Sequence, residues 1–250
     1  MRLIYISLFL LVISQPAAAA PLTVYAAAST VTAMKPLEKL WKETHNRSLR
    51  IVYGSSGALA RQISLGATAH VYFSANPCWI DYLANQKAIR PESRKTIFAN
   101  RLVLIGPTAA KRHTVTDLSV DLPRLLGRNG RLAIGDPRHV PAGRYARQAL
   151  IASGIWKTVA PRSARTRNVR LALALVQRGE APIGIVYRSD ARNDKLVRIL
   201  HKLPEHLHAT IIYEAVATTT RHPKAVAFLS FLTSPVAIRA YRDAGFTVPE

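Results

Sequence analysis

Short apolar runs alternate with longer amphipathic segments through the first third of this chain. The runs are rich in β-branched and aromatic residues, which is typical of strands, and the segments between them have helical spacing of their apolar residues. The predicted strands are 22–27, 49–53 and 70–74, and the helices that follow them are 31–44, 58–65 and 79–86. This alternation favours a mostly parallel sheet covered by helices on both faces.

The same alternation starts again after residue 100. The strands predicted here are 101–107, 131–134, 183–187 and 209–217, and the helices are 143–152, 169–178, 224–233 and 236–244. The first of these strands leaves one lobe and the last returns to it, which predicts two α/β lobes joined by two crossing strands. We expect a first lobe of residues 20–103 and 211–250, and a second lobe of residues 104–210. The carboxyl ends of the parallel strands would then face a cleft between the lobes.

The beginning of the chain has the pattern of a secretory signal peptide. Arg2 precedes an apolar stretch at 3–13, and the small residues at 17–20 suit a cleavage site, so we expect residues 1–19 to be removed. The apolar stretch is too short to cross a bilayer, and no later segment is long and apolar enough to do so. The sequence therefore predicts an exported protein without stable membrane insertion.

The net charge of the chain favours anionic partners. Lys and Arg number 35 against 14 Asp and Glu, so the formal charge is +21, which attracts anions of any size. The basic residues are scattered along the sequence, and the arginine-rich groups at 162–167 and 188–195 are loop-like and contain no interleaved aromatic residues. No nucleic-acid-binding motif is present. A basic surface is the simplest interpretation, and a polyanion-binding protein is an alternative that charge alone supports.

Neutral donor groups follow the predicted strands, at the edge that would face the cleft. The positions are Ser29, Ser56, Ala142, Val169 and Tyr187. Most of them open a helix, where backbone N–H groups lack partners and the helix dipole favours an anion. Singly they have ordinary explanations, such as helix caps for the serines and a half-buried strand position for the tyrosine. Only their joint placement on one edge indicates a binding site.

Five motifs of this chain resemble, in order and spacing, those of the periplasmic molybdate-binding proteins. They lie at 26–29, 54–63, 135–143, 169–176 and 181–187. The resemblance runs from about residue 22 to residue 246. It implies the two-lobed periplasmic binding protein fold of type II, location in the periplasm, and delivery of the ligand to the membrane permease of an ABC transporter. We further expect a monomer that needs no cofactor.

The resemblance further implies how the ligand, molybdate or tungstate, is held. The hydroxyls of Ser29, Ser56 and Tyr187 and the backbone amides of Ala142 and Val169 would donate to the oxyanion. Aligned neutral donors can replace the water shell of a dianion without a counter-charge. A site without a carboxylate has no acceptor for an acidic proton, so it should prefer fully deprotonated tetrahedral anions to hydrogen phosphate. A receptor for another such anion, for example sulfate, stays open as an alternative.

An enzyme is the competing class. No Gly-x-Ser-x-Gly motif occurs, and none of the histidines, including His139, lies in a hydrolase pattern that would give a serine its base. Cys78 is the single cysteine and has no charged neighbour in sequence, so it is neither half of an internal disulfide nor an activated thiol. The histidines at 201, 206 and 208 do not have the spacing of a standard metal site. We therefore expect no catalytic residues and no site for a bare metal ion.

Overall fold

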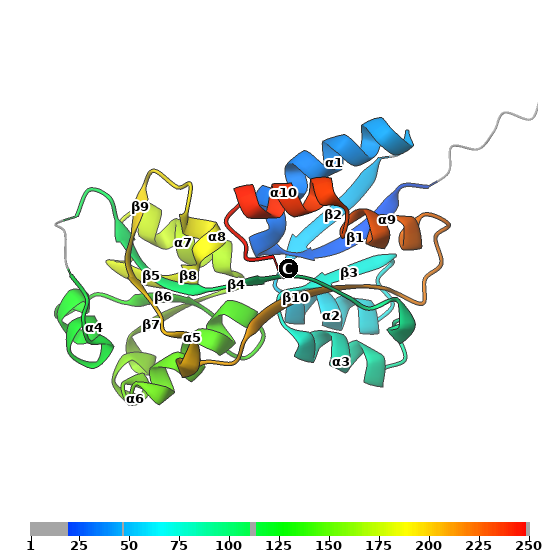
Figure 1. Ribbon diagram of the computed structural model, residues 1–250. Coiled ribbons are helices and arrows are strands. Elements are labelled where there is room, and N and C mark those ends of the chain that lie inside the picture. The colour runs from blue at the N-terminus through cyan, green and yellow to red at the C-terminus, as the bar shows by residue number, and fades with distance from the viewer. Residues whose placement is uncertain (1–19, 47, 111–113, 249–250) are drawn as a thin grey trace, which may run out of the picture.

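The computed structural model describes residues 20–46, 48–110 and 114–248, and the predicted signal peptide lies outside these residues. Two lobes lie side by side, each built on one five-stranded sheet with helices packed on its faces (Figure 1). The predicted two-lobed α/β architecture is therefore confirmed. No helix in the described ranges combines the length and the apolar composition that crossing a membrane requires.

The first lobe contains both ends of the described chain. Its sheet has the strand order β2-β1-β3-β10-β4. The strands are β1 (Leu22–Ala27), β2 (Leu49–Gly54), β3 (Val71–Ser74), β4 (Lys95–Asn100) and β10 (Ile211–Ala217). The helices are α1 (Val31–His45), α2 (Ser56–Ser64), α3 (Pro77–Asn85), α9 (Ala225–Phe231) and α10 (Pro235–Asp243), with short 3-10 turns at Ala28–Thr30 and Pro91–Ser93.

The second lobe repeats this arrangement with the strand order β7-β6-β8-β5-β9. The strands are β5 (Leu102–Pro107), β6 (Leu132–Gly135), β7 (Ser163–Thr166), β8 (Ile183–Tyr187) and β9 (Val197–Lys202). The helices are α4 (Leu118–Leu126), α5 (Pro141–Ala152), α6 (Trp156–Val159), α7 (Val169–Gln177) and α8 (Arg188–Ala191), with 3-10 turns at Ala160–Arg162 and Glu205–Leu207.

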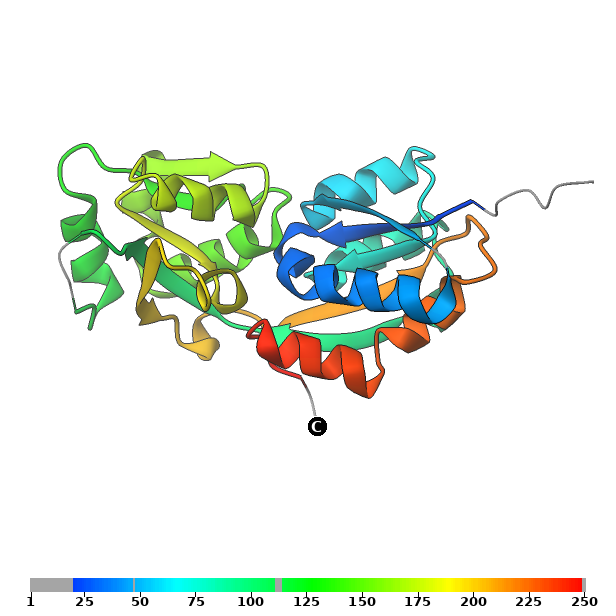
Figure 2. The same ribbon diagram turned by 90° about the horizontal axis from the view of Figure 1, so that it is seen from above.

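Each sheet is mostly parallel, with one strand reversed. The reversed strand is β10 in the first lobe, which pairs antiparallel with β3 and β4, and β5 in the second lobe, which pairs antiparallel with β8 and β9. These are the strands that carry the chain between the lobes, and the two passages run close together on one side of the molecule (Figure 2). All other strands of a sheet share one direction, so their carboxyl ends meet at one edge.

The strands that the sequence pattern did not predict lie at sheet edges. β4, β7 and β9 each have only one neighbouring strand. β7 is Ser-Ala-Arg-Thr and none of its residues is fully buried, so it shows no apolar run. The interpretation of 162–167 as a loop was therefore wrong. An edge strand is held by backbone hydrogen bonds to its neighbour and needs little side-chain burial, which removes the periodic signal.

One continuous apolar core extends through both lobes along the crossing strands. Aromatic rings fill it where the lobes meet: Phe98 of β4 lies with its ring centroid 4.7 Å from that of Tyr213 on β10 and 4.1 Å from that of Phe246. The ring centroid of Tyr213 in turn lies 5.8 Å from that of Tyr187, at the end of β8. Stacked and edge-on rings at these distances add about 0.5–1.5 kcal/mol per pair to their burial. This packing fixes the end of β8 against the first lobe.

Candidate functional site

All five residues that the sequence singled out line one cavity between the lobes. Ser29, Ser56, Ala142, Val169 and Tyr187 are each at most 3% exposed. The remaining lining residues are Ala27, Ala28, Gly54, Ser55, Ala75, Val140, Pro141 and Asn168. None of the lining side chains carries a charge, and the cavity volume of about 10 Å³ is the room that one water-sized particle occupies. The cavity therefore suits a single small ligand held by neutral groups.

Three helices begin at this cavity. α2 starts at Ser56, α5 at Pro141 and α7 at Val169. The N–H groups of Ala142 and Val169 belong to the first turns of their helices, ahead of the first i to i−4 hydrogen bond. Each helix also presents the positive end of its dipole to the same space. Three helix N-termini at one cavity favour an anion there without the help of a charged side chain.

Tyr213, which does not itself line the cavity, sets the direction of the Ser29 hydroxyl. Their oxygens are 2.7 Å apart, and the Asn100 amide nitrogen lies 3.4 Å from the Tyr213 oxygen. The Asn100 amide oxygen accepts from the Arg101 N–H at 2.9 Å, which points the amide nitrogen toward Tyr213. The Asn100 amide nitrogen also donates to the Ser189 hydroxyl at 2.8 Å. The arrangement that uses the contacts of Tyr213 with both Asn100 and Ser29 has Tyr213 accepting from Asn100 and donating to Ser29. The Ser29 oxygen becomes an acceptor, and its own proton is left for the cavity.

Ser56 is arranged in the same way by the backbone. Its hydroxyl oxygen accepts the N–H of Ala75 at 3.0 Å, so its proton is also left for the cavity. The Ser56 carbonyl accepts from the buried hydroxyl of Tyr72 at 2.8 Å, which ties the start of α2 to β3. Because both serines already accept a hydrogen bond from the protein, both are prepared to act as donors to a ligand.

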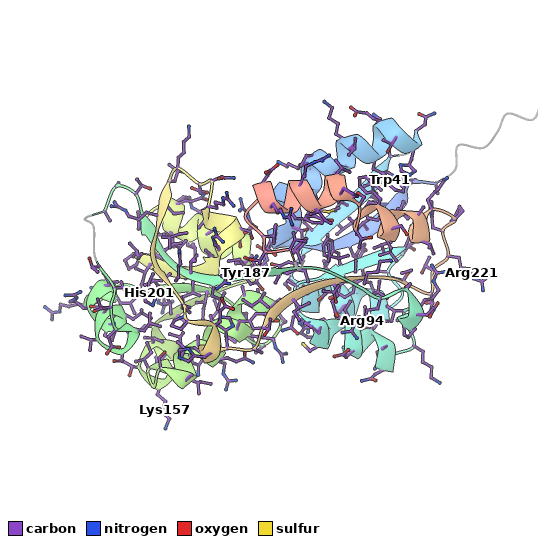
Figure 3. All side chains as sticks on the ribbon, in the orientation of Figure 1. Trp41, Arg94, Lys157, Tyr187, His201 and Arg221 are labelled. Atoms are coloured by element: carbon purple, nitrogen blue, oxygen red, sulfur yellow. The ribbon has the colours of Figure 1, made fainter. Side chains whose placement is uncertain are left out.

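Tyr187 completes the set of hydroxyls. It stands at the junction of the two lobes (Figure 3), 1% exposed, and its hydroxyl has no hydrogen-bond partner in the described part of the chain. Burial raises the pKa of Tyr187 well above its ordinary value, so the group stays protonated and can donate. A buried polar group without a partner costs about 1–3 kcal/mol, and an anion in the cavity would remove that cost.

The lobes touch directly beside the cavity. The N–H of Gly57 on α2 donates to the carbonyl of His139 in the second lobe at 3.2 Å. The Ser55 hydroxyl lies 3.4 Å from His139 Nδ1, and it also caps α2 by accepting the N–H of Ala58. A Cβ at Gly57 would collide with the His139 carbonyl and with Trp79. Glycine at this position therefore permits the close contact between the two lobes beside the cavity.

The loop that leads into α5 is equally tight. A Cβ at Gly143 would collide with the carbonyl of Gly135 at the end of β6. Asp136 anchors the turn between them, because its backbone carbonyl accepts from the N–H of Val140 at 2.8 Å. The Asp136 carboxyl binds the Arg138 guanidinium at 2.6 Å, which lowers the pKa of that carboxyl to about 2. This turn positions the first N–H groups of α5 at the cavity.

Comparison with known proteins agrees with this geometry. A family model of bacterial extracellular solute-binding proteins matches residues 22–247. The chain belongs to this family. The molybdate-binding protein ModA of Escherichia coli is 41% identical over 230 residues, which are 91% of this chain and 89% of that protein. ModA of Haemophilus influenzae is 36% identical, over 92% of this chain and 91% of its own.

A solved structure shares the fold of this solute-binding protein. The periplasmic molybdate-binding protein of Azotobacter vinelandii superimposes with a TM-score of 0.79, covering 92% of this chain and all of that one at 27% identity. The two-lobed fold of this chain is thus also the fold of a solved periplasmic molybdate-binding protein.

Two residues that the sequence did not indicate complete the site of this solute-binding protein. Tyr213 and Asn100 do not line the cavity, yet they set the direction of the Ser29 hydroxyl. Asn100 ends β4 immediately before the chain passes to the second lobe. Tyr213 lies on β10, within a segment whose apolar pattern predicted only a strand. Their role depends on contacts across more than 110 positions of sequence, which no local pattern reports.

The polar groups beside the cavity are engaged in structural roles. Ser55 caps α2 through its hydroxyl, and His139 faces it across the lobe contact. Burial lowers the pKa of His139, so the imidazole is neutral near pH 7. Burial also raises the pKa of the Cys78 thiol, which keeps it in the unreactive protonated form. The group that this site can best accommodate is an acceptor-rich anion.

Proposed function

We propose that this solute-binding protein captures molybdate or tungstate in the interlobe cavity and delivers it to the membrane permease of an ABC importer. The observation that carries the proposal is the set of three buried hydroxyls, on Ser29, Ser56 and Tyr187, that can each donate a proton into a cavity whose lining includes no carboxylate. Both ModA relatives, at 41% and 36% identity, support this choice of ligand.

The donors would bind the oxyanion as follows. Ser29, Ser56 and Tyr187 donate through their hydroxyls, and Ala142 and Val169 donate through the backbone. A fully deprotonated tetrahedral dianion can accept from all of them. Hydrogen phosphate carries a proton that would face donors only, and each contact spoiled in this way costs about 1–3 kcal/mol. The site would therefore select against phosphate by its lack of an acceptor.

The same proposal covers location and handling of the ligand. Residues 1–19 act as a signal peptide, and the remaining chain works in the periplasm as a monomer. Closure of the lobes, through the contact of Gly57 with His139, holds the ion. No cofactor or bare metal ion takes part, since molybdenum enters as its oxyanion and leaves unchanged.

Thermal unfolding tests this proposal directly. A ligand present at 100 times its dissociation constant adds about 2.7 kcal/mol of stability, so molybdate and tungstate should each raise the Tm by several degrees. Sulfate and phosphate at the same concentration should raise it far less. Equal shifts with all four anions would show that charge alone is recognised. No shift with molybdate or tungstate would refute the proposed function.

A further inference from the structure

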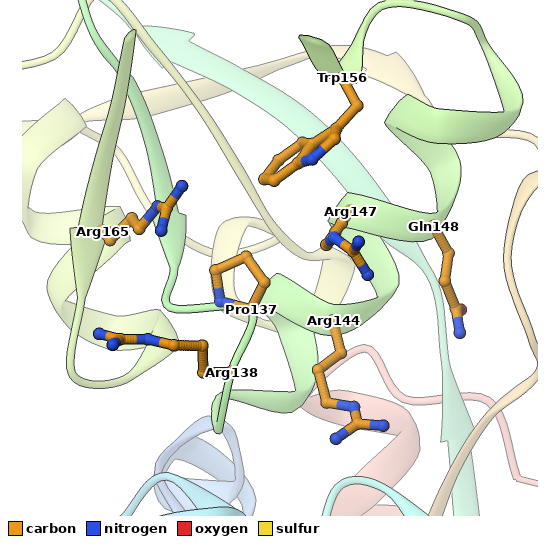
Figure 4. Close-up of a pocket in the computed structure, with 7 residues that line it drawn as sticks. All are labelled: Pro137, Arg138, Arg144, Arg147, Gln148, Trp156 and Arg165. Carbon is orange, nitrogen blue, oxygen red and sulfur yellow. The ribbon is translucent and has the colours of Figure 1, made fainter. Parts of the chain in front are cut away.

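A second, larger hollow lies on the second lobe, near its contact with the first lobe. Its volume is about 500 Å³, and it is formed by the loop after β6, by α5, by α6 and by β7 (Figure 4). The residues that line it are Pro137, Arg138, Arg144, Arg147, Gln148, Trp156 and Arg165. Four of the seven are arginines and none is acidic. The arginines are scattered in sequence, and only the fold gathers them around one space.

Most of this positive charge has no partner within the protein. Arg138 is paired with Asp136 at 2.6 Å, which offsets its charge. Arg144, Arg147 and Arg165 form no ion pair with any other described residue. Like charges gathered at one place repel one another, and a bound anion would relieve that repulsion.

Two of the guanidinium groups are held in position by tryptophan rings. Arg147 lies over Trp156, with its central carbon 5.8 Å from the ring centroid. Arg144 lies over Trp79 of the first lobe at 5.9 Å. A cation over an aromatic face at these distances gains about 0.5–1 kcal/mol at an exposed site, which limits the motion of the guanidinium while leaving its N–H groups available. The pocket is therefore partly organised before any ligand arrives.

We propose that this pocket is a second anion site, which binds a small polyanion carrying at least three negative charges. The charge follows from the three unpaired guanidiniums, each of which can bind a phosphate or a carboxylate through two N–H groups. The size follows from the volume, which is in the range of sites for small organic ligands and is far larger than that of the interlobe cavity. The site is separate from the proposed oxyanion site, so either assignment can fail alone.

Calorimetric titration at low salt tests this second site. The probes are inorganic tripolyphosphate and citrate, which separate phosphate from carboxylate recognition, with sulfate as a small dianion for reference. Binding of one polyanion at a one-to-one ratio supports the proposal and identifies the group that is recognised. If neither polyanion binds more tightly than sulfate, the proposal is wrong.

Matched variants separate the pocket from the general surface charge. Arg147→Gln with Arg165→Gln should weaken binding of the polyanion about tenfold or more, because two bidentate contacts are lost. Arg128→Gln with Arg221→Gln removes the same charge from exposed positions outside the pocket, and should change binding by no more than about twofold. Equal weakening by both pairs would mean that binding is diffuse, and would overturn the assignment.

Two further measurements keep the result independent of folding and of the proposed function. Trp156 fluorescence should change on addition of the bound polyanion, and this change should be lost in Trp156→Phe while the other tryptophans remain. Molybdate should still raise the Tm of the Arg147→Gln, Arg165→Gln protein, which shows that the variant is folded. If that shift is absent in the unaltered protein while tripolyphosphate or citrate binds, only the proposed function fails.

Discussion

The interlobe cavity and the pocket lined by Arg138, Arg144, Arg147 and Arg165, here called the arginine pocket, offer two opposite ways to hold an anion. The cavity is lined by neutral, mostly buried side chains and has room for one small particle. The arginine pocket on the second lobe has a volume of about 500 Å³ and is lined by four arginines. It is open to solvent, since Arg138, Arg147 and Arg165 are exposed. The first turn of α5 lines the cavity, and its residues Arg144, Arg147 and Gln148 line the pocket (Figure 4).

The difference between them concerns water. A dianion in the cavity loses its hydration shell, so it needs donors at fixed positions, and fixed dipoles supply them without the cost of burying a counter-charge. An anion in the pocket stays partly hydrated, so charge provides attraction but little discrimination by size or protonation. Selectivity is therefore expected in the neutral site and salt-dependent attraction in the charged one.

The largest effect is expected when two donors of the cavity are removed together. Ser29→Ala combined with Ser56→Ala should weaken molybdate binding by about 2–6 kcal/mol, because each lost donor costs about 1–3 kcal/mol. Isothermal titration measures the loss. Arg147→Gln with Arg165→Gln serves as the control and should leave molybdate affinity nearly unchanged. The comparison breaks down if the arginine variant loses more molybdate affinity than the serine variant.

A buried carboxyl behind the neutral cavity should make stability depend on pH. Burial raises the pKa of Asp190 to about 6. The Arg170 guanidinium nitrogen lies 3.4 Å from the Asp190 carboxyl oxygen and opposes this rise. Because folding raises this pKa, the folded protein binds the carboxyl proton more tightly than the unfolded chain does. The stability that this proton provides is complete below about pH 4 and is lost as the pH rises through 6, where the buried carboxyl ionises. Asp190→Asn should therefore be more stable than the original protein by as much as about 3 kcal/mol at pH 8, with little difference at pH 4.

Chemical denaturation at the two pH values measures this difference. The neutral amide mimics the protonated carboxyl, so the two proteins should converge in acid. A variant that is less stable at pH 8 would show that the ionised carboxylate contributes favourably through Arg170, contrary to the prediction.

Tyr187→Phe should change stability and binding in opposite directions. The free protein should become more stable by about 1 kcal/mol, because a buried hydroxyl without a partner is removed. Molybdate affinity should fall by about 1–3 kcal/mol, since the ligand loses a donor. Unfolding with and without molybdate gives both values. A variant that binds as well as the original protein would remove Tyr187 from the proposed donors.

A smaller effect is expected from the residue that directs Ser29. Tyr213→Phe keeps the ring in the aromatic cluster and removes only the hydroxyl that is hydrogen-bonded to Ser29. The Ser29 proton is then free to turn away from the cavity, and molybdate affinity should fall by about 1 kcal/mol. Phe246→Tyr adds a hydroxyl to a neighbouring ring and serves as the control for altered packing. Equal losses in both variants would point to packing instead of donor direction.

The smallest effect is expected from salt on molybdate affinity, which should hardly change with ionic strength. Raising the ionic strength from about 0.01 to 0.1 M shortens the Debye length from about 30 to 10 Å and screens exposed charges. Tripolyphosphate binding should weaken strongly over this range, whereas molybdate binding should change little once the ion is enclosed. Dissociation constants measured across the range decide the matter. A strong salt response of molybdate would place it at the charged surface.

Much of the fold could be predicted because its central strands and helices bury periodic apolar faces. The pattern indicated β1, β3, β6 and β8 as well as the helices that open at the cavity. It missed β4, β7 and β9, because edge strands depend on backbone pairing more than on burial. The positions of Ser29, Ser56 and Tyr187 at ends of strands were also evident from the order of elements. Their use as ligands stays a prediction.

By itself, the sequence determined which groups could meet: strand and helix order places neutral donors at one edge of each sheet. Only the tertiary structure decided which way those donors point. Tyr213 and Asn100 orient Ser29 from a distant strand and from the passage between lobes. The arginine pocket was likewise hidden, since its members are ordinary surface positions along the chain. Local periodicity reports burial, but the direction of a proton and the convergence of charges depend on distances that only folding fixes.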